Sequence, residues 1–414
     1  MDSRRARICC LDLDTFFVSV ERIFDPSLIG QPVVVGAMPG NRGVVTAASY
    51  EVRAFGVRSG ISMTEAVRLA PNAIYVPTRD GAYAQYSKQV RAIIERYSPV
   101  VRPASIDEFY IDFEGCERLY RQPTDTDGDA TIARVVTEIR AAIQTELGLP
   151  ASAGIGTSHT IAKIASGRAK PAGTLMIRTG EERAFLAPLS VRKYPGIGPV
   201  AEKRLHEAGI HTLDQLMTAI DQPGSKRFGP LAACVRRVLR PVGAAEWREE
   251  RPAFREFDPD GRTVGSISNE RTFMADVHDQ QQVHNQLRAL AERVSWRARR
   301  RDVCARTVTL KLRYADFQTL TRSRTIAPTD TEADIMRTVF ELYAQAHTRS
   351  VAIRLLGVGL SNFAQAERQL QLSFDGRPRA KISSAVDSVR SQFGYQAIRL
   401  GAVADRREGR RGDD

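Results

Sequence analysis

Two clusters of acidic residues, far apart in the sequence, are the part of this chain best suited to chemistry. The first consists of Asp12 and Asp14, which follow an apolar run that starts at Ile8. The second consists of Asp107 and Glu108, which precede another apolar run. Both clusters stand at the end of an expected buried strand, where carboxylates are costly unless they hold a cation. Two such strand ends side by side would make an oxygen-rich site for Mg²⁺, which favours phosphoryl or nucleotidyl transfer with two metal ions.

Strand geometry limits which of these acids can share a site. Asp12 and Asp14 would lie on one face of the strand and Leu13 on the other. Asp107 and Glu108 are adjacent, so both can reach one site only at a strand end or turn. Three of the acids, Asp12, Asp107 and Glu108, can then surround two Mg²⁺ ions, and the carbonyl oxygen of Leu13 can add a further ligand. Either cluster alone also fits ordinary turn or capping acids, because short acidic patterns are common.

A second set of residues could bind phosphate. Tyr50 and Arg53 lie three positions apart at an expected helix start, and therefore on one face. Arginine offers a planar fork for phosphate oxygens, and tyrosine offers a hydroxyl. Lys170 ends another expected helix directly before Pro171 and could reach a triphosphate. Each cation, taken alone, could equally be a solvated surface charge.

A glycine-containing turn between two expected helices is a third motif. It has the sequence Pro-Gly-Ile-Gly-Pro over residues 195–199. Glycines in such a turn expose backbone N–H groups to a phosphate, as in a helix-hairpin-helix. Gly196 and Gly198 would then bind the DNA backbone without sequence preference. A purely structural hairpin of two helices is the alternative.

The chain carries a formal net charge of +12. This charge alone fits either a basic soluble surface or a polyanionic partner. Its distribution favours nucleic acid, because several arginines crowd the end of one expected helix and further basic residues follow on two expected strands. The arginines at the helix end include Arg297, Arg299, Arg300 and Arg301. A surface of this kind suits a phosphate backbone.

The length of 414 residues exceeds one ordinary core and predicts about two to four domains. Hydrophobic residues make up 43% and charged residues 26%, as in a soluble globular protein. No apolar run approaches the roughly 18 residues of a membrane helix, and the N-terminus does not resemble a signal peptide. We therefore expect a cytoplasmic protein without membrane contact. The five cysteines lack CxxC spacing, which predicts neither a zinc site nor a disulfide framework.

The first part of the chain, residues 1–178, alternates expected strands and helices, as in an α/β or α+β domain. The strands are expected at 8–13, 33–35, 44–46, 100–103, 109–112, 153–155 and 175–177. The helices are expected at 16–24, 49–55, 64–70, 83–97, 130–147 and 160–168. Residues 179–245 are expected to be helical with short loops, and the charged stretch 246–262 to be a linker.

The last part of the chain has the order strand, helix, strand, strand, helix, strand within residues 263–363. The strands are expected at 264–267, 307–314, 319–325 and 353–360, and the helices at 279–299 and 331–345. This order suits one four-stranded sheet backed by two helices. A polar tail follows, with one more helix expected at 383–393.

The order of these motifs closely resembles the Y-family translesion DNA polymerases, and most closely their bacterial DNA polymerase IV branch. The resemblance covers about residues 7–400 and rests on six motifs. They are the runs that start at Asp12 (Asp-Leu-Asp-Thr-Phe-Phe), Ala48 (Ala-Ser-Tyr-Glu-Val-Arg), Ser105 (Ser-Ile-Asp-Glu), Ala162 (Ala-Lys-Ile-Ala-Ser), Lys170 (Lys-Pro) and Pro195 (Pro-Gly-Ile-Gly). Each motif is weak alone, whereas six in this order are very specific.

The resemblance implies a multidomain α+β fold shaped like a right hand. Its parts would be a ferredoxin-like palm (1–22 and 79–178), small fingers (23–78), a helical thumb with a helix-hairpin-helix (179–245), a linker (246–262), a four-stranded α/β little finger that grips DNA (263–363) and a C-terminal tail (364–414).

The resemblance also implies roles for single residues. The catalytic acids and metal ligands would be Asp12, Asp107 and Glu108, with the Leu13 carbonyl as a further ligand. The substrate-binding residues would be Phe16, Phe17, Tyr50, Arg53 and Lys170, the last three on the triphosphate. Phe17 stands where the family keeps its steric gate, a bulky ring that crowds a ribose 2′-OH and selects deoxynucleotides; it could otherwise be a core aromatic. Asp14 is not a usual metal ligand in the family.

A short motif in the tail resembles the peptide by which such polymerases dock on the sliding clamp. Gln369, Leu372 and Phe374 fit the pattern Gln-x-x-Leu-x-Phe. An extended peptide that places Leu372 and Phe374 in an apolar pocket is physically reasonable. A short strand or a loose tail is the alternative.

We therefore expect a template-directed, error-tolerant DNA polymerase that adds dNTPs to a primer 3′-OH on damaged or misaligned primer-template DNA. Two Mg²⁺ ions would serve the nucleotidyl transfer, and the enzyme would be a monomer that binds the sliding clamp. A catalytically inactive DNA-binding paralogue would be expected to lack one of the three acids, and all three are present. A palm-type nucleotide cyclase would need neither the helix-hairpin-helix nor the basic C-terminal domain.

Overall fold

The computed structural model describes residues 5–79, 81–222, 231, 235, 265–365, 379–399 and 401. The chain divides into two compact units, residues 1–257 and 258–414, and each is described by itself. The division falls within the predicted linker 246–262, which lies outside the described residues.

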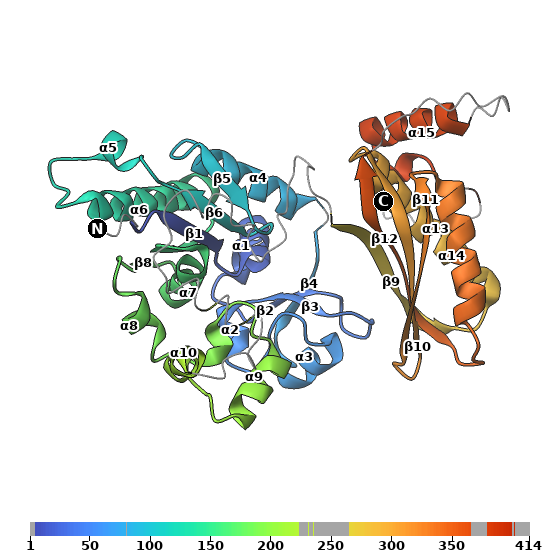
Figure 1. Cartoon of the computed structure of the whole chain (residues 1–414), viewed down its shortest axis with the longest axis horizontal. Helices are drawn as coiled ribbons and strands as arrows, with labels where there is room; N and C mark the ends of the chain where they lie inside the picture. Colours follow the sequence, from blue (N-terminus) through green and yellow to red (C-terminus); the bar gives the residue numbers. More distant parts are fainter. Residues whose placement is uncertain are drawn as a thin grey trace. The chain divides into compact units, whose positions relative to one another are not determined.

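The first unit is built on a five-stranded sheet with the order β5-β6-β1-β7-β8 (Figure 1). The strands are β1 (Ile8–Leu13), β5 (Val100–Pro103), β6 (Glu108–Asp112), β7 (Ala151–Gly156) and β8 (Thr174–Met176). Neighbouring strands are antiparallel, except that β7 and β8 are parallel. All six residues of the central strand β1 are buried, so helices or loops must cover both faces of the sheet.

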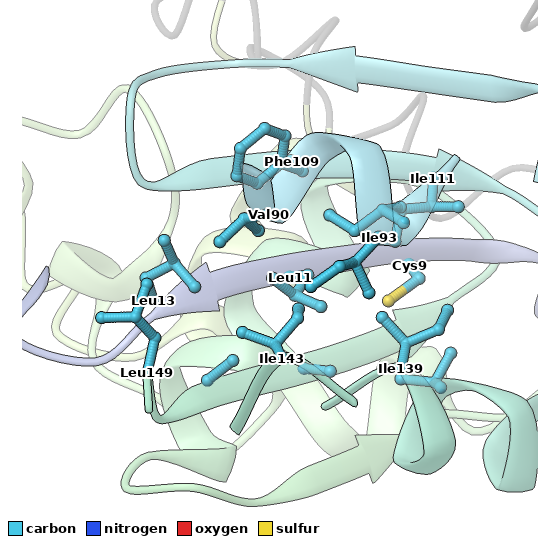
Figure 2. Packing of buried hydrophobic residues seen from close by; sticks show 14 of the residues in the cluster. Cys9, Leu11, Leu13, Val90, Ile93, Phe109, Ile111, Ile139, Ile143 and Leu149 are labelled. Atoms are coloured by element: carbon cyan, nitrogen blue, oxygen red, sulfur yellow. The ribbon is translucent and has the colours of Figure 1, made fainter. Parts of the chain in front are cut away.

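The two faces of this sheet pack against different helices. Cys9, Leu11 and Leu13 share one core with side chains of α4 (Ala82–Ile94) and α6 (Gly128–Leu147), as Figure 2 shows. Cys10 lies in a separate cluster with Ala162 of helix α7 (His159–Ala169). Cys9 and Cys10 therefore point to opposite faces of the sheet. By the same alternation, Asp12 lies on the face that α7 covers.

A smaller three-stranded sheet lies wholly within the predicted fingers segment. Its order is β3-β2-β4, with β2 (Val33–Gly36), β3 (Val45–Ala48) and β4 (Ile74–Pro77). It has its own hydrophobic core, which includes Val34, Val52 and Met63. Ser49 links sheet and helix, because its hydroxyl accepts from Val33 N at 3.1 Å and from Val52 N at the start of α2 (Tyr50–Arg53).

The remaining elements of the first unit are short. They are α1 (Phe16–Phe24), the 3-10 helix η1 (Pro26–Leu28), α3 (Met63–Leu69), α5 (Glu117–Tyr120), α8 (Glu182–Leu186), the 3-10 helix η2 (Val191–Lys193), α9 (Pro199–Glu207) and α10 (Leu213–Asp221). The helices after residue 179 agree with the predicted helical segment. Helix α6 begins two residues before the expected 130, because Asp127 caps it: its carboxylate accepts from Ala130 N at 2.7 Å.

The second unit has the predicted arrangement of one four-stranded antiparallel sheet backed by two helices. The elements are β9 (Ser266–Val277), α13 (Gln280–Arg299), β10 (Val303–Tyr314), β11 (Thr319–Thr329), α14 (Glu332–Ala346) and β12 (Ile353–Gln365), and the sheet order is β11-β10-β12-β9. Figure 1 shows α13 and α14 on one face of this sheet. Val308, Leu310 and Leu312 of β10 point into the core beneath them.

The other face of the four-stranded sheet carries small, hydroxyl-bearing and basic residues. In β10, Thr309, Lys311 and Arg313 alternate with the core residues and are not buried. Opposite them on β11 stand exposed Ser323, Thr321 and Thr319, and the neighbouring strand β12 contributes Gly357 and Gly359. Strand β9 is longer than the predicted 264–267, because most of its later residues are not buried and they lack an apolar pattern.

A C-terminal helix, α15 (Arg379–Phe393), packs onto the second unit and is followed by the 3-10 helix η4 (Tyr395–Ala397). A buried ion pair joins Arg390 of α15 to Glu292 of α13. Arg299 of α13 also pairs with Asp387 of α15 at 2.6 Å. Two ion pairs thus join α15 to the C-terminal half of α13, and the helix predicted at 383–393 is confirmed with an earlier start.

Most elements predicted from the sequence are present, with ends that differ by a few residues. Strand β4 and helix α5 were not predicted, because each has only four residues and neither is buried on an apolar face. Within the described residues, no helix is long and apolar enough to cross a membrane. The cytoplasmic location stays a prediction.

Candidate active site

The pairing of β1 with β6 brings the two acidic clusters together. Asp12 stands directly opposite Glu108 in the antiparallel register. Leu13 N donates to the carbonyl oxygen of Asp107 at 2.9 Å, which fixes the turn before β6 against the end of β1. The Asp12 side chain is largely buried, with 12% of its surface exposed. The two expected strand ends therefore lie side by side.

Helix α7 places two lysines on these carboxylates. Lys163 Nζ lies 3.0 Å from Asp12 Oδ2 and is also hydrogen-bonded to Glu108. Lys170, just after the helix, is hydrogen-bonded to Asp12 through its Nζ. Burial alone would lower the pKa of Lys163, but the neighbouring Cys10, Asp12 and Glu108 raise it above the ordinary value. Lys163 is therefore a cation at neutral pH.

The donor set fits a hard divalent cation, because carboxylate and carbonyl oxygens are the ligands that such ions prefer. In this structure the positive charge on these oxygens is supplied by Lys163 and Lys170. The Asp107 side chain instead accepts from Ser105 Oγ. Over the described residues, no group of three or more His, Cys, Asp or Glu side chains is arranged to hold a metal ion. The structure thus brings Asp12 and Glu108 together, whereas the Asp107 carboxylate is turned to its own loop.

Asp14 lies beside this site and is buried, with 1% of its surface exposed. Its carboxylate accepts from Ser152 Oγ and Ala172 N, each at 2.7 Å, and from Tyr50 Oη at 3.1 Å. Lys170 Nζ is 3.8 Å away. These donors compensate the loss of water around the carboxylate. Asp14 therefore links β1, β7 and α2 without facing Glu108.

The residues predicted to bind a triphosphate lie around the same strand end. Tyr50 donates to Asp14, and burial followed by the charge of Asp14 raises the pKa of its phenol above the ordinary value. Arg53 is exposed; its guanidinium lies 4.9 Å from the Tyr50 ring centroid, and its Nε donates to Ala48 O at 3.1 Å. The structure brings Tyr50 and Lys170 to one carboxylate, and Arg53 lies beside Tyr50.

Phe17 is half-buried and stacks on Tyr83 of α4. The two ring centroids are 3.9 Å apart and the rings are 3° from parallel. Tyr83 Oη donates to the buried Glu21 at 2.7 Å, and Arg79 Nη2 lies 2.9 Å from the same carboxylate. The side chain of Phe16, by contrast, is 3% exposed and lies in the core. The Phe16 ring therefore serves the core, and the predicted substrate role of this residue stays a prediction.

The glycine turn has the backbone geometry that requires glycine. Gly196 has a φ of +94°, in the left-handed region. Gly198 is the N-cap of α9, and Pro199 occupies its first turn. The turn is held by Arg192 Nη1, which donates to Ile197 O at 2.6 Å. Both predicted glycines therefore stand at the start of a helix.

The arginines predicted to bind DNA differ in their surroundings. Arg300 is exposed and lies 5.1 Å from the Trp296 ring centroid, and Arg301 is half-exposed. Arg297 donates to Ser268 O at 2.9 Å. Arg299 is engaged with Asp387, with 14% of its side chain exposed, so its guanidinium serves the packing of α15. We therefore carry the other three, but not Arg299, into the proposal below.

Two residues of this site were not predicted from the sequence. Lys163 could have been noticed because it stands seven positions before Lys170, about two helical turns away, and therefore on the same face of the expected helix. The role of Tyr83 could not be predicted, because the residues around it in the sequence do not distinguish it from an ordinary core aromatic.

Comparison with known proteins identifies the family. A model described as the impB/mucB/samB family matches residues 11–167, and the model of its C-terminal domain matches residues 264–374. The helix-hairpin-helix motif described for the same family matches residues 179–210.

Curated relatives match nearly the whole chain. A DNA polymerase IV of Dehalococcoides mccartyi (strain CBDB1) is 36% identical over 397 residues, which are 95% of this chain and 97% of the relative. A DNA polymerase IV of Streptomyces coelicolor is 40% identical over 358 residues, 86% of this chain and 70% of the relative. Among solved structures, a Y-family DNA polymerase chimera matches the fold with a TM-score of 0.71 at 22% identity, over 86% of this chain and 98% of the other.

The family models and the curated relatives together define a nucleotidyltransferase with a multidomain α+β fold. The chain belongs to the Y-family of translesion DNA polymerases, in its bacterial DNA polymerase IV branch. It is a DNA-directed DNA polymerase, and its relatives imply dependence on a divalent metal.

The close packing of α7 on β7 gives a first testable prediction. A Cβ at Gly154 would lie 2.1 Å from Ser166 N and 2.2 Å from Ala162 O, both in the backbone of α7. Gly154→Ala should therefore push away the helix that carries Lys163. We expect a loss of stability of about 3 kcal/mol, as for overpacked cores, and a loss of primer extension. Urea unfolding and an extension assay measure both.

Gly167→Ala in the same helix is the matched control. A Cβ at Gly167 meets nothing within 4 Å. Alanine there should leave extension unchanged and stabilise the helix by up to about 1 kcal/mol. Equal behaviour of the two variants would contradict the tight contact at Gly154.

Proposed function

We propose that this polymerase joins a dNTP to a primer 3′-OH with Asp12, Asp107 and Glu108 as ligands of two Mg²⁺ ions and the Leu13 carbonyl as a further ligand. The observation that carries this proposal is the register that sets Asp12 opposite Glu108, with Asp107 hydrogen-bonded to Leu13 through its backbone. When bound, such ions lower the pKa of the attacking hydroxyl and stabilise the leaving pyrophosphate. Asp107 would have to turn from Ser105 to join them.

The residues around this centre suit a triphosphate. Lys170 and Tyr50 both reach the carboxylates of β1, and Arg53 adjoins Tyr50 on the exposed side. A phenol has a single hydrogen to donate, and Tyr50 gives it to Asp14 in this structure. Tyr50 must therefore exchange acceptors to donate to a phosphate oxygen. Lys170 must likewise leave Asp12, so both groups are held in place before the nucleotide arrives.

Phe17 is proposed as the steric gate of this site. It lies three residues beyond Asp14 on the first turn of α1, and its ring is fixed from behind by Tyr83. A rigid ring next to the sugar would clash with the 2′-OH of a ribonucleotide. The smaller 2′-hydrogen of a deoxynucleotide would fit beside the same ring. The enzyme would therefore prefer deoxynucleotides.

The duplex would be held by two other surfaces. The turn at Gly196 and Gly198 would bind phosphate at the start of α9. On the open sheet face of the second unit, Lys311 pairs with Glu270 at 2.8 Å and Arg313 lies beside the hydroxyl of Thr319. This face suits contact with a phosphate backbone once Lys311 leaves Glu270, and Arg297, Arg300 and Arg301 add charge at the end of α13. The predicted division into palm, fingers, thumb and little finger remains our proposal for the domain limits.

The three acids give the direct test of the metal site. Asp107→Ala should abolish primer extension on undamaged template with Mg²⁺, because a ligand of the metal site is lost; an effect of about 10³-fold or more is expected for such a residue. Asp112→Ala, at the far end of the strand that follows Asp107, should keep extension. Substantial residual extension by the Asp107 variant would contradict the assignment of Asp107 as a metal ligand.

The proposed gate predicts a change in sugar selection. Phe17→Ala should raise ribonucleotide incorporation, because the ring that collides with the 2′-OH is gone. We expect the ratio of kcat/KM for dNTP over rNTP to fall by about 10²-fold or more. Single-nucleotide insertion with matched dNTP and rNTP measures it. An unchanged ratio would place the gate elsewhere.

We also propose that the chain docks on a sliding clamp through Gln369, Leu372 and Phe374. These residues lie outside the described part of the chain, so the proposal rests on the sequence pattern alone. Deleting residues 369–374 should remove stimulation by the clamp and spare basal extension. Extension assays with and without clamp test this, and equal stimulation of the truncated protein would refute the docking site.

A further inference from the structure

The ring of Tyr83 makes two contacts with one face of helix α1. Phe17 and Glu21 are four residues apart on that helix and therefore neighbours on its surface. The Tyr83 ring stacks on Phe17, with the centroids 3.9 Å apart and the planes nearly parallel. Its hydroxyl reaches past Phe17 and donates to Glu21 Oε1 at 2.7 Å. The two contacts together fix both the position and the tilt of the ring.

Glu21 is itself held in place. Its side chain is 1% exposed, and a carboxylate buried this deeply requires hydrogen-bond donors or a cation. Tyr83 supplies one donor, and the Arg79 guanidinium supplies the cation, with Nη2 at 2.9 Å from Oε2. Arg79 also donates its backbone N–H to Tyr83 Oη at 3.1 Å. Glu21, Arg79 and Tyr83 thus form a closed set of contacts, here called the gate support.

The gate support stands behind the one side chain assigned to sugar selection. A steric gate discriminates only as well as it resists displacement, because a ring that can retreat admits the 2′-OH at low cost. Phe17 is half-buried, so its own packing leaves one side open. Tyr83 covers the side that faces α4 and blocks retreat in that direction.

We propose that Tyr83, held by Glu21 and Arg79, is a positioning residue that sets the sugar selectivity of the enzyme by preventing Phe17 from yielding to a ribose 2′-OH. The inference rests on the proposed function, because it acts only through Phe17. It adds a second determinant of deoxynucleotide preference, on a different helix from the gate itself.

The test is single-nucleotide insertion by the full-length enzyme, with matched dNTP and rNTP opposite an undamaged template base. Tyr83→Leu removes both the stack and the hydrogen bond. We expect the ratio of kcat/KM for dNTP over rNTP to fall about thirtyfold, mainly through better use of rNTP, while dNTP insertion stays within a few fold of wild type. Tyr83→Phe keeps the stack and loses only the hydrogen bond, so the ratio should fall about fivefold.

Two further variants show whether the effect passes through Phe17. In a Phe17→Ala background, Tyr83→Leu should change the ratio by less than about twofold, since residues acting as one unit are not additive. Tyr86→Leu is the matched control: Tyr86 lies on the same helix and its ring packs edge-on against Phe24 instead, with the centroids 6.2 Å apart. It should leave the ratio unchanged.

The outcomes separate this inference from the proposed gate. A relaxed ratio for Phe17→Ala, together with an unchanged ratio for a folded Tyr83→Leu variant, would overturn the gate support and leave the gate intact. An unchanged ratio for Phe17→Ala would overturn the gate and the support together. Additive effects in the double variant would show that Tyr83 acts independently of Phe17. If Tyr83→Leu does not fold, an unchanged ratio for Tyr83→Phe overturns the hydrogen-bonded support.

Discussion

The carboxylates at the buried end of β1 are the constraint on which the rest of the first unit depends. Asp12 and Asp14 lie where water is largely excluded, so each needs donors or cations from the protein. Asp12 obtains them from Lys163 and Lys170, and Asp14 from Ser152, Tyr50 and a backbone N–H. These partners come from helix α7 and the residues after it, from strand β7 and from helix α2. The need to pair these two buried carboxylates therefore brings together the lysines and the hydroxyl groups that a bound nucleotide would need.

The sheet itself makes this gathering possible. Because β1 is the central strand, β6 and β7 bring Glu108 and Ser152 directly opposite Asp12. Because Gly154 has no side chain, the backbone of α7 can approach β7 closely, and Lys163 can reach the carboxylates at the end of β1. The apolar face beneath, seen in Figure 2, anchors the strand so that its polar end stays in register.

Strands could be predicted from the sequence where their apolar residues follow the pattern of a buried or half-buried strand. The apolar run after Asp107 predicts the strand β6, and the alternation in β10 predicts one covered face, so this strand and the four-stranded sheet could be foreseen. The open face of β9 carries no apolar pattern, and its length was underestimated for that reason. Side-chain partners were beyond prediction. From the sequence, there was equal reason to expect DNA binding by Arg299 and by Arg300. The structure shows that Arg299 forms an ion pair with Asp387, which is distant in the sequence. Phe16 and Phe17 are adjacent and alike, and only packing separates a core ring from an accessible one.

The resting site is already neutralised, which changes how binding should be understood. Lys163 and Lys170 occupy the oxygens that divalent ions would use, and Tyr50 has given its one hydrogen to Asp14. Binding of metal and nucleotide is then an exchange of partners in which the number of compensated charges hardly changes. Its free energy is a difference between two well-paired states, so affinity reflects small changes in geometry more than the total charge brought together. On the assignment proposed above, this exchange would release both lysines from the carboxylates, and their charges would then face the anionic triphosphate.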